Sequence, residues 1–182
     1  MLGAGSVLFR HRGWTPVPLL AGQWFYGTRA QLALGLVVLT VGEAIRLWAV
    51  GHIGARSRTR TDAVGSLVET GPFGLCRNPL YVGNALILLG VGCWSGPPWA
   101  AAWLLFAVLQ YAAVVRWEES ILLQNHGEDF EAYCRRVPRW LPKGLTRNPG
   151  RANWLGAVRS ERPTLTAIAC VTALFWAPFF DV

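Results

Sequence analysis

The stretch QLALGLVVLTVGEAIRLWAV, from Gln31 to Val50, decides the fold class of this chain. Its 20 residues match the length at which an α-helix crosses the roughly 30 Å hydrocarbon core of a bilayer. Glu43 and Arg46 interrupt the run one helical turn apart, so their charges can neutralise each other. We interpret them as a structural pair that faces neighbouring helices. The alternative is a polar lining for a cavity, because charges at membrane depth are costly.

Further apolar runs follow along the chain. Residues 79–94 and 99–115 flank the link Ser95-Gly96-Pro97-Pro98, in which Gly and Pro predict a tight hairpin turn. A last run, residues 164–180, follows Pro163. Because a helix satisfies its own backbone hydrogen bonds inside a bilayer, we predict an all-α, polytopic membrane bundle of about 4–5 transmembrane helices.

The segment 14–26 is also apolar but contains Pro16 and Pro18. It is compatible with a short span, a re-entrant piece or a segment at the membrane surface, and these alternatives stay open. No shift in composition divides the 182 residues, so we predict one domain. Its expected parts are an N-terminal segment 1–30, a core 31–142, a basic loop 143–162 and a C-terminal apolar helix 163–182.

The composition points to a membrane rather than to a nucleic acid. Hydrophobic residues make up 53% of the chain and charged residues 15%, below the roughly 25% charged share of a soluble domain. The net charge is +7, but the basic residues gather beside apolar runs, where they meet anionic lipid head groups. We expect membrane lipids as partners, no nucleic acid and no obligate protein partner. The four cysteines show no metal-ligand spacing, so no metal site is predicted.

The basic residues also predict the orientation. Loops rich in Arg and Lys stay on the cytoplasmic side, which leaves the uncharged turn 95–98 outside. The abundance of Arg, Ala and Gly suggests a bacterial source, so we expect a bacterial cytoplasmic membrane with the active site on its cytoplasmic side. The basic loop residues are Arg56, Arg58, Arg60 and Arg77 before the second run, and Arg135, Arg136, Arg139, Lys143, Arg147, Arg151, Arg159 and Arg162 after the third.

The segment 71–84, GPFGLCRNPLYVGN, holds the first candidate site residues. Asn78 is expected to cap a helix by accepting from its free amides, and Pro79 suits the first helical position. Such a helix start, beside Arg77, attracts a carboxylate or phosphate. The alternative is only a capped helix with interfacial side chains. Two more candidates lie inside the predicted helix, a tyrosine one turn from the arginine and a glycine that permits close approach: Tyr81 and Gly83.

A second group follows the third apolar run. Glu118 and Glu119 repel each other at the unfavourable end of a helix dipole. This pair is either fully solvated or receives a cation or hydroxyl donors, and Tyr111 shares a helix face with Glu118. Residues 127–137 then carry acids in the first turn and arginines in the last, which predicts a short amphipathic helix under the membrane core. Its apolar stripe, most simply explained by packing, comprises Phe130, Tyr133, Cys134 and Val137.

Together these blocks resemble the isoprenylcysteine carboxyl methyltransferase and phospholipid methyltransferase superfamily. Its pattern is a GP[YF]…RHPxYxG block followed by an EE…[FH]G…Y…V…P block, and both occur here in order between residues 46 and 142. Asn78 stands where the family often has His. Because Asn can cap a helix but cannot titrate, this departure argues against proton transfer at that position.

The resemblance implies a membrane enzyme that binds S-adenosylmethionine in a pocket formed by cytoplasmic loops and the short amphipathic helix, without a metal. Methyl transfer to an oxygen or nitrogen depends mainly on positioning and exclusion of water. The implied acceptor is a lipid-like, prenylated or isoprenoid amphiphile. The implied catalytic residues are Arg77, Tyr81 and Glu118, and the implied cofactor-binding residues are Asn78, Pro79, Tyr81, Gly83, Glu118, Glu119 and Tyr133.

Two other functions compete with this one. Membrane sterol and steroid reductases share part of the pattern and use NADPH, but Leu80 replaces the Asn of their block. A small non-catalytic membrane subunit would explain the apolar runs, but it would leave the two ordered motifs as a coincidence.

Overall fold

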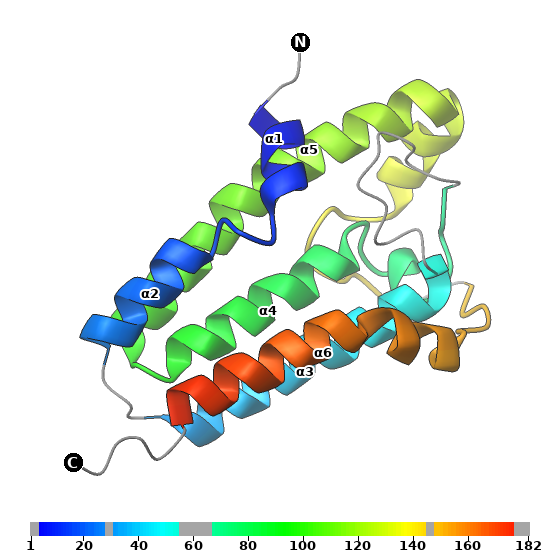
Figure 1. The fold of residues 1–182 in the computed structure, drawn as a ribbon. Helices are drawn as coiled ribbons and strands as arrows, with labels where there is room; N and C mark the ends of the chain where they lie inside the picture. Colours follow the sequence, from blue (N-terminus) through cyan, green and yellow to red (C-terminus); the bar gives the residue numbers. More distant parts are fainter. Residues whose placement is uncertain (1–3, 28–30, 55–66, 145–147, 177–182) are drawn as a thin grey trace.

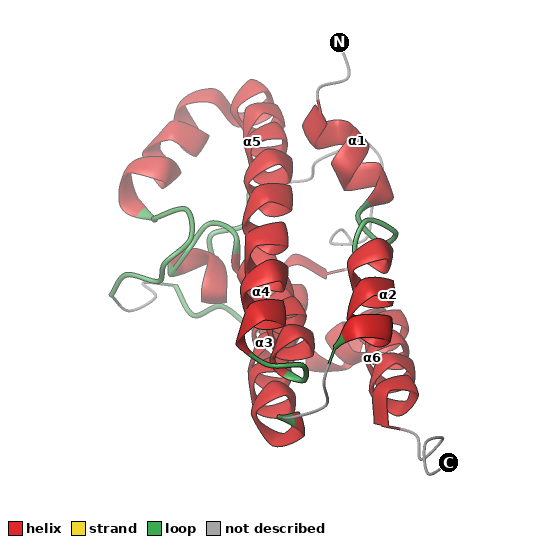
Figure 2. Ribbon diagram, turned by 90° about the vertical axis from the view of Figure 1, so that its left-hand side faces the viewer, coloured by secondary structure: helices red, strands yellow, loops and turns green. Residues whose placement is uncertain are grey.

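The computed structural model describes residues 4–27, 31–54, 67–144 and 148–176. Within these ranges the chain consists of helices and loops without a β-strand (Figures 1 and 2), which confirms the all-α prediction. Arg56, Arg58, Arg60 and Arg147 lie outside the described residues. The elements are α1 (Ala4–His11), α2 (Val17–Tyr26), α3 (Leu32–Ile53), the 3₁₀ turn η2 (Gly71–Gly74), α4 (Pro79–Cys93), α5 (Pro97–Arg136) and α6 (Trp154–Trp176).

Helix α4 is central because it packs between α3 and α5 (Figure 1). Helix α6 packs on α3, and α1 packs on α5, so the described helices extend outward from α4 on both sides. The predicted hairpin between α4 and α5 is present, and Gly96 at its centre has φ +92°. This arrangement brings the N-terminal end of α4 beside the C-terminal half of α5.

Helices α3 and α4 touch backbone to backbone through two glycine pairs. A methyl group added at Gly42 would lie 2.7 Å from Gly83 O, and one added at Gly90 would lie 2.7 Å from Gly35 O. Both distances are shorter than van der Waals contact, so side chains larger than hydrogen do not fit. Small residues at such crossings are typical of helices that associate in membranes.

Among the described residues, two helices, α3 and α5, are long and apolar enough to cross a membrane. Helix α4 is apolar but has only 15 residues. In the undecided segment 14–26, residues 14–16 form a turn and the rest forms the 10-residue helix α2. This helix is about 15 Å long at 1.5 Å per residue, half of a bilayer core. The count of about 4–5 transmembrane helices therefore remains a prediction.

The predicted short amphipathic helix forms the end of α5. Gly127, with φ +48° and ψ −120°, interrupts the helical backbone and separates residues 128–136 from the rest. Phe130, Tyr133 and Val137 then form a buried cluster, against which Cys134 packs. The apolar stripe is therefore packing, as predicted.

Helix α6 begins earlier than predicted. The segment 143–162 was expected to be a loop, but it is helical from Trp154, and Pro163 lies inside the helix rather than before it. The side chain of Asn153 accepts a hydrogen bond from the backbone N–H three residues on at 2.9 Å, which caps the helix. Pro163 removes one backbone hydrogen bond inside the helix.

Candidate functional site

Two backbone hydrogen bonds hold the first motif against the segment that follows α5. Arg77 N donates to Pro138 O at 2.8 Å, and Lys143 N donates to Leu75 O at 3.3 Å. Residues 75–77 therefore lie alongside residues 138–143. The structure thus brings both predicted motif blocks to one place.

Arg77 is largely enclosed by protein partners, with 11% of its side chain exposed. Its Nε lies 3.2 Å from Glu119 Oε1. Its Nη1 donates to the carbonyl oxygens of Cys134 at 3.1 Å and Val137 at 3.3 Å. Because these groups occupy the guanidinium, Arg77 joins the start of α4 to the end of α5, and a ligand anion would have to share it.

Glu119 is the centre of this polar cluster. Its Oε1 accepts from Arg77 and, at 3.2 Å, from Asn78 Nδ2. Its Oε2 accepts from Arg139 Nε at 3.0 Å and Nη2 at 2.7 Å. Sequence reasoning counted Arg139 only as a loop charge. The signal that could have found it is Glu119 itself, because a buried carboxylate needs cationic partners.

Asn78 does not cap α4 with its side chain, which corrects the sequence prediction. Its amide nitrogen instead donates to Glu119 Oε1 and to Arg139 O, both at 3.2 Å. A buried carboxylate competes successfully for the amide because charge-assisted hydrogen bonds are stronger than neutral ones. Pro79 does occupy the first turn, as predicted.

Tyr81 and Glu118 form a second pair beside the cluster. The Tyr81 hydroxyl donates to Glu118 Oε1 at 2.8 Å. The Tyr81 ring also packs against Tyr111, with centroids 5.1 Å apart, so Tyr111 and Glu118 do share a face. Glu118 lies beyond the apolar part of α5, and burial raises its pKa to about 7. Its carboxylate is therefore a better proton acceptor than an ordinary glutamate.

Two other predicted site residues have structural partners. Gly83 faces α3, where an added methyl group would lie 2.7 Å from both Arg46 Cγ and Gly42 O. The close approach expected at Gly83 is thus made by a helix. The buried Tyr133 hydroxyl donates to Phe73 O at 2.7 Å and fixes η2 on the end of α5.

A polar cavity of about 550 Å³ opens next to Tyr81. Its volume lies within the range of small-molecule sites. The lining comes from the turn after α1 and from α3, α4, α5 and α6. Its charged and polar residues are Arg12, Arg46, Tyr81, Asn84, Tyr111, Glu161 and Thr164.

Arg46 anchors the wall of this cavity. Its Nη2 lies 2.6 Å from Glu161 Oε2 and its Nε lies 3.4 Å from Glu43 Oε2, while Nη1 donates to Asn84 Oδ1. The predicted Glu43–Arg46 pair is therefore present, and the alternative interpretation also holds because Arg46 lines a cavity. Sequence reasoning missed Glu161, which lies in the segment predicted as a loop.

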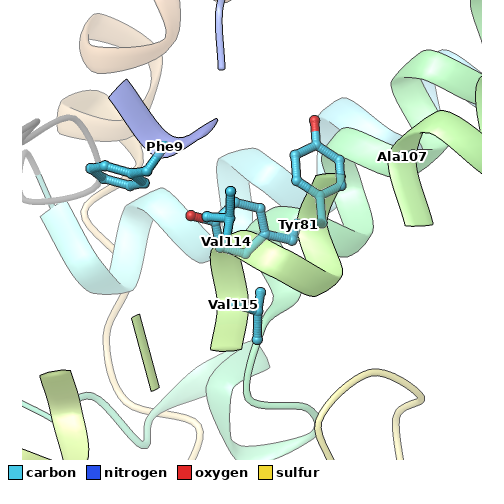
Figure 3. Close-up of a cluster of buried hydrophobic side chains, with 6 residues drawn as sticks. Phe9, Tyr81, Ala107, Val114 and Val115 are labelled. Carbon is cyan, nitrogen blue, oxygen red and sulfur yellow. The ribbon is translucent and has the colours of Figure 1, made fainter. Parts of the chain in front are cut away.

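An apolar groove of about 310 Å³ lies on the other side of the same tyrosines. Tyr81 and Tyr111 line both the groove and the polar cavity. Figure 3 shows Tyr81 among buried side chains of the neighbouring helices. The remaining groove walls are apolar and include Val82, Leu86, Leu89, Val108, Trp140 and Leu141.

A third hollow, an open cleft of about 510 Å³, exposes the outer side of the polar cluster. Arg77, Glu119 and Arg139 contribute to its wall together with Arg116 and Arg135. The two adjacent glutamates therefore lie at different sites. Glu119 lines this cleft, and Glu118 accepts a hydrogen bond from Tyr81. Among the described residues, no group of three or more His, Cys, Asp or Glu side chains could hold a metal ion.

Fold and site thus define an all-helical protein with membrane-length helices and a polar cavity that meets an apolar groove. Residues 30–129 match the model of the phospholipid methyltransferase family. This match covers more than half of the 182 residues. The chain belongs to the phospholipid methyltransferase family, which confirms the resemblance found in its motifs and identifies it with a membrane-integral family.

Three curated proteins are similar to the chain. The nickel-cobalt-cadmium resistance protein NccN of Alcaligenes xylosoxydans xylosoxydans is 37% identical over 115 residues, 63% of this chain and 51% of the relative. The cobalt-zinc-cadmium resistance protein CzcN of Cupriavidus metallidurans is 34% identical over 156 residues, 85% of this chain and 65% of the relative. The phosphatidyl-N-methylethanolamine N-methyltransferase of Saccharomyces cerevisiae is 29% identical over 90 residues, 47% of this chain and 44% of the relative.

The chain thus spans about half to two thirds of the length of the two resistance proteins. No solved structure matches it.

Proposed function

We propose that this chain transfers a methyl group from S-adenosylmethionine to an oxygen or nitrogen of a lipid-like or isoprenoid amphiphile at the inner membrane leaflet. The observation that carries this proposal is the junction at Tyr81 and Tyr111, where the polar cavity meets the apolar groove. An amphiphile needs both environments, one for its reacting head and one for its chain. Membership of the phospholipid methyltransferase family supports the reaction type.

The residues around the polar cavity fit the cofactor. S-adenosylmethionine carries a carboxylate, an ammonium group, a sulfonium centre and a ribose diol. Arg46 suits the carboxylate, for which it would share its guanidinium with Glu161 and Glu43. The faces of Tyr81 and Tyr111 suit the sulfonium cation or the adenine ring. When bound, the cofactor supplies a methyl group activated by the sulfonium.

The chain's own residues then position the acceptor and hold its proton. Tyr81 donates to Glu118 and lines the junction, so its oxygen is available to accept a proton from the acceptor while its own proton passes to Glu118. The raised pKa of Glu118, about 7, suits this role near neutral pH. Arg77, Asn78 and Glu119 act as positioning residues, because they fix the start of α4 against α5.

The apolar groove suits a hydrocarbon chain that enters sideways from the bilayer. A phospholipid amine, an isoprenoid or lipid acid and a prenylated cysteine all combine such a chain with a methylatable head. The names of two relatives concern resistance to metal ions. We place the proposed chemistry on a lipid because the apolar groove meets the polar cavity at Tyr81 and Tyr111.

The deciding experiment measures cofactor-product binding first and transfer of labelled methyl groups into lipid second. We expect purified protein in detergent to bind S-adenosylhomocysteine by calorimetry, and membranes that contain it to transfer labelled methyl groups into extracted lipid. Binding of NADPH without S-adenosylhomocysteine would instead indicate a reductase. Binding of neither compound would indicate a non-catalytic subunit.

A further inference from the structure

Arg12 reaches the polar cavity from a segment outside the family match. It directly follows α1 and lines the cavity, whereas the match with the family begins at residue 30. Arg12 also acts electrostatically on Tyr81 and Glu118. The N-terminal segment therefore adds a cation to a site otherwise built largely from matched residues.

The Arg12 guanidinium is held in a fixed position. Its Cζ lies 3.9 Å from the centroid of the Phe9 ring, and its Nη1 donates to Phe9 O at 3.0 Å. Phe9 is buried and packs against Trp117 of α5, with ring centroids 5.0 Å apart. A cation stacked on a buried ring loses little further conformational freedom when it binds an anion.

The turn that follows α1, residues 12–16, also packs against α5. Thr15 Oγ1 donates to the buried Gln110, and α1 approaches so closely that a methyl group at Gly5 would lie 2.6 Å from Ala113 O. These contacts flank Arg12 on both sides. The position of Arg12 at the cavity thus follows from packing and does not need a ligand to create it.

Arg12 and Arg46, the two arginines that line the cavity, differ in whether a carboxylate neutralises their charge. Arg46 is paired with Glu161 and Glu43. Among the described residues, none of the ion pairs involves Arg12. Its remaining donors are therefore available to an anion inside the cavity.

We propose that Arg12 binds an anionic group, a phosphate or a carboxylate, on the head of the acceptor, so that the enzyme selects acidic amphiphiles over neutral ones. This inference rests on the proposed function and names its substrate class. A cofactor common to a family is expected to be held by the segment that its members share. Arg12 lies outside that segment, which favours the acceptor as its ligand.

The test measures binding of amphiphiles with equal chains and different heads. Decyl phosphate, decanoate and decanol are titrated by calorimetry into detergent-solubilised wild type, Arg12→Gln and Arg10→Gln. Arg10 is the matched control, because it is exposed on α1 and absent from the cavity lining. We expect Arg12→Gln to lose about tenfold to a hundredfold in affinity for the anion that binds, the range of a charge-assisted hydrogen bond. Decanol binding and the Arg10→Gln variant should be unchanged.

Three results overturn the inference: equal affinities in wild type and Arg12→Gln, an equal loss in Arg10→Gln, or a loss of S-adenosylhomocysteine affinity in place of amphiphile affinity. Preference for decyl phosphate or for decanoate identifies which anion Arg12 accepts. Thermal unfolding of each variant, measured in parallel, separates lost binding from lost folding. Failure of the proposed function is distinguishable, because wild type would then bind the anionic amphiphile without binding S-adenosylhomocysteine.

Discussion

Arg77 Nε lies 3.2 Å from Glu119 Oε1, although the two residues are 42 positions apart in the sequence. Their side chains are only 11% and 10% exposed. The pair joins the start of α4 to the C-terminal half of α5, the two places from which the motif residues come. It follows that both motif blocks are parts of one structural unit, which also positions Tyr81 and Glu118.

Glu119→Gln should destabilise the protein strongly. The variant leaves Arg77, whose side chain is only 11% exposed, without its carboxylate, and breaking one partner of a buried pair costs about 3–5 kcal/mol. Thermal unfolding in detergent measures the effect. The control is Glu131→Gln, whose pair with Arg135 is 3.8 Å long and more than half exposed, so its loss should cost about 0–1 kcal/mol. Equal stability of the two variants would contradict the central role of Glu119.

Gly83→Ala should disturb the contact between α3 and α4. The new methyl group would lie 2.7 Å from a backbone oxygen of α3, and overpacking of this kind costs about 1–3 kcal/mol. Gly22→Ala is the matched control, because its methyl group would meet only Trp99, at 3.4 Å. Alanine should stabilise α2 there by up to about 1 kcal/mol. Folded yield and melting temperature measure both changes, and a neutral Gly83→Ala would contradict the tight helix crossing.

Stability should depend on pH through Glu118. Its folded-state pKa of about 7 lies above the ordinary value of 4.5, so the folded protein holds a proton that the unfolded chain has released between these values. The stability that this group contributes is therefore complete below pH 4.5 and is lost as the pH rises through about 7. Melting temperatures at pH 5 and pH 8 should differ less in Glu118→Gln than in wild type. An unchanged difference would mean that Glu118 does not titrate in this window.

The sequence predicted those features that depend on local pattern. The apolar run at 31–50, the hairpin at 95–98 and the helix after Gly127 follow from hydrophobic period and from Gly and Pro positions, and all three are present. The apolar run begins only after Pro163, so the sequence pattern places the start of α6 too late. The signal for the true start was Asn153, a residue type favoured at helix N-caps.

Partners across the fold could not be predicted in the same way. Asn78 has the sequence context of a cap, but a carboxylate that lies 41 residues later takes its amide. Likewise, Arg12 and Glu161 enter the polar cavity from opposite ends of the chain. Sequence spacing reports only neighbours on one helix, so contacts that depend on helix packing stay hidden until the helices are assembled.

Tyr81→Phe should lose turnover and keep its fold. The variant retains the ring that packs against Tyr111 and removes only the hydroxyl that donates to Glu118. If this hydroxyl passes a proton, methyl transfer should fall by about 10²- to 10⁴-fold, the usual contribution of general acid–base catalysis. Tyr111→Phe is the matched control, because Tyr111 lines the same junction without binding Glu118. The rate of labelled methyl transfer, with S-adenosylhomocysteine affinity beside it, separates the two positions. A similar fall in both variants, or a fall in affinity alone, would show that Tyr81 binds and does not relay a proton.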